Sequence, residues 1–157
     1  MLSISHAVTG AFIAVKVGNP YLAIPLIILS HYLEDAVPHW DVGTGLGKGT
    51  KSSKDAFRHE LIDLALTAVV VLVFYYSRYP LVPNLANASV LNFAPYWGVF
   101  FALLPDFLEA PRNFWRWEPR WLAPLNRFHH SFHHSIPRML DGLAPQVILL
   151  SILWFFR

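Results

Sequence analysis

Cysteine is absent from this chain of 157 residues. Its absence excludes disulfides, thiolate nucleophiles, iron–sulfur clusters and cysteine-based zinc sites. Any metal ion that the protein binds must therefore be held by nitrogen and oxygen ligands. The chain has eight histidines that can supply nitrogen ligands.

Charged residues are scarce as well. They make up 14% of the chain, against about 25% in an average soluble domain, and 55% of the residues are hydrophobic. This composition is typical of an integral membrane protein. The net charge of only +2 argues against nucleic acid as a partner. The N-terminus has no basic stretch and no small-residue cleavage site, so we expect no removable signal peptide.

Five apolar segments, separated by proline, glycine and polar residues, predict an all-α fold in one domain over residues 1–157. A helix rises about 1.5 Å per residue and the hydrocarbon core is about 30 Å thick, so several of these segments are short for membrane spans. We predict an integral membrane bundle of about five short helices, with an interfacial segment between the fourth and the fifth, and an oligomer is possible. The segments lie at about 3–17, 21–37, 61–76, 90–109 and 143–156.

If all five segments cross the membrane, the polar residues sort between two faces. One face holds the N-terminus and the connections 38–60 and 110–142, and most lysines and arginines lie there. The positive-inside rule makes this face cytoplasmic. The histidines, aspartates and glutamates also lie at or near it. We therefore predict a bacterial or archaeal inner-membrane protein whose functional site is cytoplasmic.

A His-x-x-x-Asp pattern occurs twice at the edges of apolar segments, as His31 with Asp35 and as His59 with Asp63. Residues four apart lie about 5–6 Å from each other on one helix face, close enough for an imidazole and a carboxylate to bind one ion. Ionisable groups inside apolar segments are costly unless they are paired or coordinate a metal. The pattern predicts a metal site at the end of a helix bundle.

A third stretch, Leu103-Leu104-Pro105-Asp106, is followed one turn later by Glu109. Carboxylates three residues apart face the same way, so they could bridge two ions or orient a ligand histidine. An ordinary amphipathic helix end is the alternative.

Four histidines gather in the run Phe128–Ser135. Helical spacing pairs His129 with His133 and His130 with His134, so we expect at least one pair to face the pocket. The alternative is an interfacial helix that contacts lipid phosphates. His6 stands alone and is either a ligand or a hydrogen-bonding residue at a helix start.

These motifs resemble those of the membrane-bound metal-dependent hydrolase family (YdjM-like) of bacteria and archaea. The Ser-His-x-x-x-Asp helix, the Leu-Leu-Pro-Asp segment and the His-x-x-x-x-His-Ser motif of that family correspond to residues 30–35, 103–106 and 129–135, in an order that differs from the family's. Residues 31–39 are also similar to a helix of zinc-dependent phospholipase C and related nucleases. The resemblance implies a hydrolase that uses clustered metal ions.

A metal-dependent hydrolase of this kind would bind one or two divalent ions, Zn²⁺ or else Mn²⁺ or Fe²⁺, and use activated water to cleave a phosphoester or lipid at the cytoplasmic face. A spare carboxylate, Glu34, Glu60 or Glu109, would be the general base. The predicted metal ligands are His6, His31, Asp35, His59, Asp63, Asp106, His129, His130, His133 and His134.

Arginine alternates with tryptophan after the fourth segment. Such a basic and aromatic strip suits the headgroup level of a membrane, where it would gather anionic lipid or act only as an anchor. The predicted lipid-contacting residues are Arg112, Trp115, Arg116, Trp117, Arg120 and Trp121.

Two other functions are compatible with the residues. The stretch His130-Ser131-Phe132-His133-His134 reproduces the His-x-x-His-His box of fatty-acid desaturases, which favours a di-iron hydroxylase or desaturase-like oxidoreductase. The other is a non-enzymatic subunit that binds a metal or haem, whose site would be saturated with no open coordination position.

Overall fold

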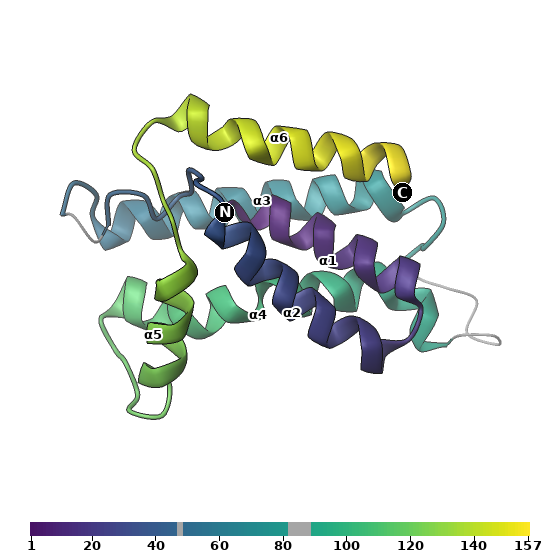
Figure 1. Cartoon of the computed structure of the whole chain (residues 1–157), viewed down its shortest axis with the longest axis horizontal. Helices are drawn as coiled ribbons and strands as arrows, with labels where there is room; N and C mark the ends of the chain where they lie inside the picture. The colour runs from purple at the N-terminus through teal and green to yellow at the C-terminus, as the bar shows by residue number, and fades with distance from the viewer. Residues whose placement is uncertain (47–48, 82–88) are drawn as a thin grey trace.

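The computed structural model describes residues 1–46, 49–81 and 89–157 (Figure 1). These residues form six α-helices and one short 3₁₀-helix, which confirms the prediction of an all-α fold for this part of the chain. Residues 47–48, in the predicted connection 38–60, and residues 82–88, between the third and fourth predicted segments, lie outside the described residues. The elements are α1 (Ser3–Val17), α2 (Pro20–Ala36), α3 (Ser53–Tyr75), η2 (Val90–Phe93), α4 (Ala94–Trp115), α5 (Ala123–Phe132) and α6 (Met139–Phe156).

Local signals explain where the first helices begin and end. Gly18 ends α1 in the left-handed conformation, with φ of 65°, which glycine adopts without a Cβ penalty. The Asn19 side chain then accepts a hydrogen bond from the backbone N–H of Tyr21, and Pro20 occupies the first turn of α2. The chain therefore reverses direction in a few residues.

Two helices extend beyond the predicted apolar segments. Helix α3 begins at Ser53, well before residue 61, because the Ser52 hydroxyl accepts a hydrogen bond from the N–H of Asp55. Helix α4 continues past residue 109 to Trp115. The predicted connections 38–60 and 110–142 are thus partly helical, and the second of them contains α5.

Helices α1 to α4 and α6 lie side by side and alternate in direction (Figure 1). The N-terminus, the α2–α3 connection and the segment from the end of α4 to the start of α6 therefore gather at one end of the bundle, on the left in the figure. Helix α5 lies across this end. The C-terminus and the α1–α2 turn lie at the other end.

Helix α1 occupies the centre of the bundle and packs chiefly against α4, and also against α2 and α3. Small residues make this close packing possible. A Cβ added at Gly10 would lie 2.5 Å from the carbonyl oxygen of Gly98, so the backbones of α1 and α4 nearly touch there. Ala7 and Ala11 are fully buried in the same core. The tight crossing holds the later turns of α4 close to the start of α1.

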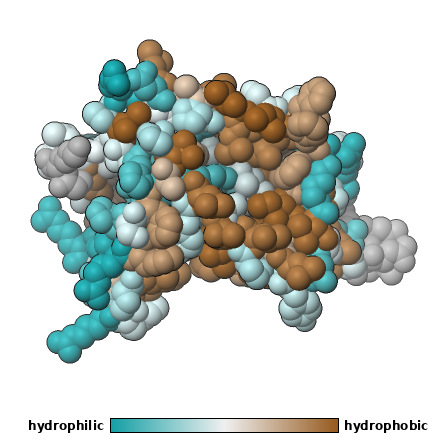
Figure 2. Space-filling model, in the orientation of Figure 1, coloured by the Kyte–Doolittle hydropathy of each residue, from teal (hydrophilic) through white to brown (hydrophobic). Residues whose placement is uncertain are grey.

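By length and composition, two helical stretches could span a membrane: Val90–Trp115, which joins η2 to α4, and Met139–Phe156. Helix α1 is apolar but shorter. Figure 2 shows apolar side chains over the middle of one face of the molecule and hydrophilic side chains gathered toward the end that α5 crosses. The hydropathy of the surface therefore changes along the length of the bundle, from an apolar middle to a hydrophilic α5 end.

Candidate metal centre

Four side chains from three helices converge at the α5 end of the bundle. His31 and Asp35 lie on the last turns of α2, Asp106 lies on α4, and His129 lies on α5. The Nε2 atom of His129 lies 2.9 Å from Asp35 Oδ2 and 3.1 Å from His31 Nε2. Both imidazoles also lie 3.7 Å from Asp106 Oδ1. One possible ligand atom from each residue thus faces a common point, and we call these four residues the first group.

The spacing of the first group fits a tetrahedral ion. Zinc–nitrogen and zinc–oxygen bonds of about 2.0–2.1 Å place neighbouring ligand atoms about 3.3 Å apart in a tetrahedron. The separations that involve an imidazole of the first group run from 2.9 to 3.7 Å, with His31 Nε2 to Asp35 Oδ2 at 3.6 Å. A single divalent ion can therefore be bound after small side-chain adjustments.

A polar partner lies at the far side of each ring and leaves Nε2 available to a metal. The Nδ1–H of His31 donates to the carbonyl oxygen of Ala102 at 2.8 Å, so the Nε2 lone pair of the neutral ring points at the group. Glu109 Oε2 lies 3.4 Å from Nδ1 of His129. Carboxylates and carbonyls in this position orient ligand histidines in many metal sites. Among the predicted roles for Glu109, its position suits orienting a histidine.

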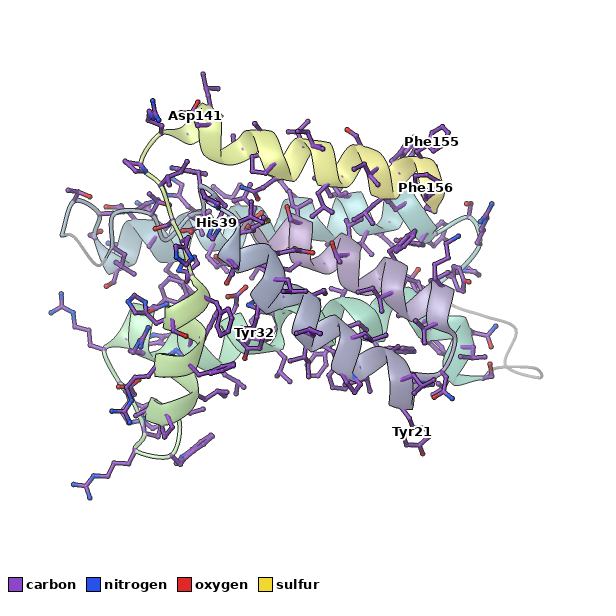
Figure 3. All side chains as sticks on the ribbon, viewed as in Figure 1. Tyr21, Tyr32, His39, Asp141, Phe155 and Phe156 are labelled. Carbon is purple, nitrogen blue, oxygen red and sulfur yellow. The ribbon has the colours of Figure 1, made fainter. Side chains whose placement is uncertain are left out.

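A second group shares Asp35. It contains His39, which follows the end of α2, and His133, which follows the end of α5. His39 Nε2 lies 3.8 Å from Asp35 Oδ1. Asp41 joins the two imidazoles, because its Oδ2 lies 3.1 Å from His39 Nε2 and 3.0 Å from His133 Nε2. Figure 3 shows His39 between α5 and the end of the bundle.

The charge balance of the second group favours a cation. The Nδ1–H of His39 donates to the carbonyl oxygen of Val37 at 2.8 Å, so Nε2 can face Asp41 only if His39 is protonated or an ion lies between them. Burial lowers the pKa of His39, which disfavours protonation. Burial also lowers the pKa of His133, but its hydrogen bond to Asp41 raises the pKa above the ordinary value.

Backbone hydrogen bonds, not helical spacing, hold His39 in place. Its N–H donates to His134 O at 3.1 Å, and its own carbonyl oxygen accepts from Ile136 N at 2.7 Å. The N–H of His134 donates to Asp35 O at 3.0 Å. Gly142 of α6 packs on the same loop, since a Cβ there would lie 2.3 Å from Trp40 N. The second group is therefore assembled by three distant segments.

The structure brings together only some of the predicted ligands. His31, Asp35, Asp106, His129 and His133 lie in the two groups. His6 is fully buried beside them, with its ring stacked on His31 at 4.0 Å and its Nε2 3.2 Å from Asp35 Oδ1. The Met1 amino group also contacts this oxygen. Glu34 lies 2.9 Å from the other His6 nitrogen.

The second His-x-x-x-Asp pair lies outside both groups. Asp63 is buried, but its Oδ2 accepts a hydrogen bond of 2.7 Å from the backbone N–H of Ser3, at the first turn of α1. Glu60 accepts a 2.9 Å hydrogen bond from the Ser3 hydroxyl. His59 is exposed. This pair therefore lies at the start of α1, where unpaired N–H groups need acceptors.

The remaining predicted residues lie on the surface. His130 and His134 are exposed, and the Nδ1–H of His134 donates to Phe132 O. Of the basic and aromatic strip, Arg112 binds Glu109, whereas the other five residues, Trp115, Arg116, Trp117, Arg120 and Trp121, are exposed. Helix α4 ends within the strip, at Trp115.

Sequence reasoning did not predict His39 and Asp41 as site residues. The resemblance of residues 31–39 to a zinc-binding helix pointed to His39, but Pro38 interrupts the helical spacing. Asp41 carries no motif and lies beyond the helix. Both reach the site through the loop geometry described above.

No protein-family model, no curated protein and no solved structure matches this chain.

Proposed function

We propose that this protein is an integral membrane hydrolase that cleaves a phosphoester with two divalent metal ions held at the α5 end of the bundle. The observation that carries the proposal is the position of Asp35. Its Oδ2 faces His31 and His129, and its Oδ1 lies 3.8 Å from His39 Nε2 and also contacts His6 and the Met1 amino group. A carboxylate shared in this way suits a two-ion site, in which the ions lie about 3.5–4 Å apart.

Exposed apolar side chains support the membrane location. Leu29 and Leu33 on α2, Leu66 on α3, and Ile148 and Ile152 on α6 all face outward. Outward leucine and isoleucine along several neighbouring helices suit lipid better than water. Tyr21 and Phe155 project from the far end of the bundle, where aromatic side chains suit a membrane interface (Figure 3). We propose that α1, α2, α3, α4 and α6 all cross the bilayer of a bacterial or archaeal inner membrane.

The positive-inside rule supports a cytoplasmic position for the candidate metal centre. Lys51, Lys54 and Arg58 lie in the α2–α3 connection or the first turns of α3, and Arg127 and Arg138 lie on or after α5. These residues belong to the same end of the bundle as the two groups (Figure 1). Basic residues flanking membrane helices favour the cytoplasmic side.

A divalent ion held by the first or second group would lower the pKa of a bound water to about 7 and so would supply hydroxide at neutral pH. In the hydrolysis, a water oxygen forms a bond to phosphorus and the ester P–O bond breaks. A base must accept the proton of the water and return it to the leaving alcohol. His31, His129 and Asp106 would hold one ion, and His39 and His133 the other, with Asp35 between them.

Glu60 is the best placed of the three predicted bases. Glu109 is paired with Arg112 and Glu34 lies beside His6. Glu60 and Glu109 both line a cavity that also reaches Asp106 and His133, but only Glu109 is held there by an arginine. Burial raises the pKa of Glu60 to about 7, although the hydrogen bond from Ser3 opposes this shift. A general base works best when its pKa is near the working pH.

The proposal also accommodates the motif resemblance. Residues 30–35, 103–106 and 129–135 are distant in the chain, yet each contributes a member of the first or second group. Membership of the membrane-bound metal-dependent hydrolase family remains part of the proposal.

Metal content and hydrolysis test the proposed function together. We expect protein purified in mild detergent to bind about two equivalents of zinc or manganese and to hydrolyse bis(p-nitrophenyl) phosphate, with activity lost on chelation and restored by metal. Asp35→Asn removes the shared carboxylate charge, so we expect it to lose both ions. His134→Ala is the matched control, because this histidine is exposed. Metal content is measured by mass spectrometry of the digested protein.

Other results would overturn the hydrolase. A di-iron spectrum together with oxygen consumption would support the hydroxylase or desaturase-like alternative, and a haem spectrum would support the non-enzymatic one. Folded Asp35→Asn protein that keeps both ions would show that the two groups do not form the metal centre.

A further inference from the structure

A cavity of about 240 Å³ lies beside the candidate metal centre, between α3, α4 and the loop after α2. Part of its lining is polar and comes from both groups: Asp106 belongs to the first group, and His133 and its partner Asp41 to the second. Glu60 and Glu109 also line it. The cavity therefore opens directly onto the side chains that would hold the metal ions.

The rest of the lining is apolar. Leu61 and Leu64 contribute from α3, and Phe107 and Phe114 from α4. Leu61 is 52% exposed and Phe107 is 41% exposed, so the cavity extends to the outer surface of these two helices. In the proposed orientation this surface contacts lipid, because Leu61 begins the apolar part of α3. A hydrocarbon chain could enter from the bilayer without crossing water.

The charge of the lining indicates how a headgroup would be recognised. Among the described residues, no lysine or arginine lines the cavity, whereas four carboxylates do, and the amino group of Met1, which also lines it, is already paired with Asp35. An anionic phosphate would be repelled by these carboxylates unless metal ions compensate their charge. Binding of a phosphate in this cavity therefore requires the metal ions.

The size of the cavity limits the apolar part of the ligand. Its volume of about 240 Å³ is below the range of about 300–1,000 Å³ that is usual for drug-sized ligands. A cavity of this volume suits one narrow chain beside the phosphate better than two.

We propose that this cavity binds the single hydrocarbon chain of an amphiphilic phosphate ester, with the phosphate group at the metal centre. The inference rests on the proposed function and names its substrate class. Under this inference, single-chain substrates fit the cavity. Soluble phosphoesters leave its apolar part unfilled, and two-chain lipids are larger than its volume.

A chain-length series of substrates with one leaving group tests this inference. We would compare kcat/KM for p-nitrophenyl methyl, butyl and hexyl phosphate with zinc-loaded wild-type protein in mild detergent. Burial of one methylene group favours binding about fourfold, so we expect the hexyl ester to exceed the methyl ester by at least about tenfold. Calorimetric binding of hexyl phosphate to zinc-loaded and metal-free protein gives a second readout that does not depend on turnover.

Two substitutions localise the effect. Ala110→Trp fills the cavity, and we expect it to lower the hexyl-to-methyl ratio at least about tenfold. Ala65→Trp is the matched control, since Ala65 is exposed on α3 and does not line the cavity. If Ala110→Trp does not fold, Leu61→Ser at the exposed rim should lower the same ratio.

The outcomes separate the two proposals. Hydrolysis of the methyl ester without any gain from longer chains would overturn the single-chain substrate and leave the hydrolase standing. Another outcome is zinc-dependent binding of hexyl phosphate, weakened by Ala110→Trp, without hydrolysis of any ester. This outcome would support chain binding in the cavity and overturn the proposed hydrolase activity. An equal hexyl-to-methyl ratio in wild type and Ala110→Trp would show that the chain binds elsewhere.

Discussion

At the scale of single residues, the two oxygens of Asp35 face different imidazoles, and this divides the site into two groups. The Asp35 carboxylate can face both groups because α2 ends one residue after Asp35, and the chain that follows turns back toward this side chain. Neighbouring residues on one helix can also differ in their position relative to the site. His129 is buried in the first group, whereas His130, one residue further along α5, is exposed.

Glu60 gives a residue-scale prediction for pH. Burial raises its pKa from 4.5 to about 7, so between these values the folded protein retains a proton that the unfolded chain has released. The free energy of unfolding attributable to Glu60 therefore falls as the pH rises through this range. Glu60→Gln has no such titration. In metal-free protein, we expect the melting temperature of Glu60→Gln minus that of wild type to increase from about pH 5 to about pH 8.

Thermal unfolding in mild detergent, followed by circular dichroism, measures both profiles. Parallel profiles for the two proteins would show that Glu60 ionises with an ordinary pKa and would remove the main reason to prefer it as the base.

At the scale of elements, the second His-x-x-x-Asp pair supports a helix end. Asp63 accepts a hydrogen bond from the N–H of Ser3, so it satisfies one of the free donors at the start of α1. Loss of a cap of this kind costs about 0.5–2 kcal/mol. We expect Asp63→Ala to lower the free energy of unfolding by about 1 kcal/mol while the metal content stays unchanged.

Denaturant unfolding and metal analysis of the same samples test this role. His59→Ala is the control within the same motif, because His59 is exposed and should change neither property. His31→Ala should instead remove metal. A loss of metal in Asp63→Ala would restore the role that the sequence pattern predicts for Asp63.

At the scale of the whole molecule, alternating helices place opposite connections at opposite ends of the bundle (Figure 1). The absence of cysteine allows single cysteines to be introduced into an unreactive background. We expect a membrane-impermeant maleimide to label Arg78→Cys in intact cells and Lys54→Cys only after permeabilisation, since the proposal places Lys54 in the cytoplasm. Labelling of both positions from the outside would contradict the proposed topology.

The sequence alone predicted the helical class, because apolar segments broken by proline and glycine leave few alternatives for a chain of this composition. It also predicted ligands that the fold brings together: His31, Asp35 and Asp106 because ionisable residues inside apolar segments need partners, and His129 and His133 because of their helical spacing. The sequence could not distinguish the two His-x-x-x-Asp pairs, because helical spacing says which residues share a face but not what that face contacts.

Only the tertiary structure decided which ligand atoms meet. The close crossing of α1 and α4 at Gly10 and Gly98 sets the position of Asp106, and hydrogen bonds among distant segments hold His39 against Asp35. These contacts depend on packing and on loop geometry, which local patterns along the chain do not encode. The pairing of two candidate metal-binding groups through one carboxylate is therefore a property of the folded chain, whereas the supply of nitrogen and oxygen donors without sulfur is a property of the sequence.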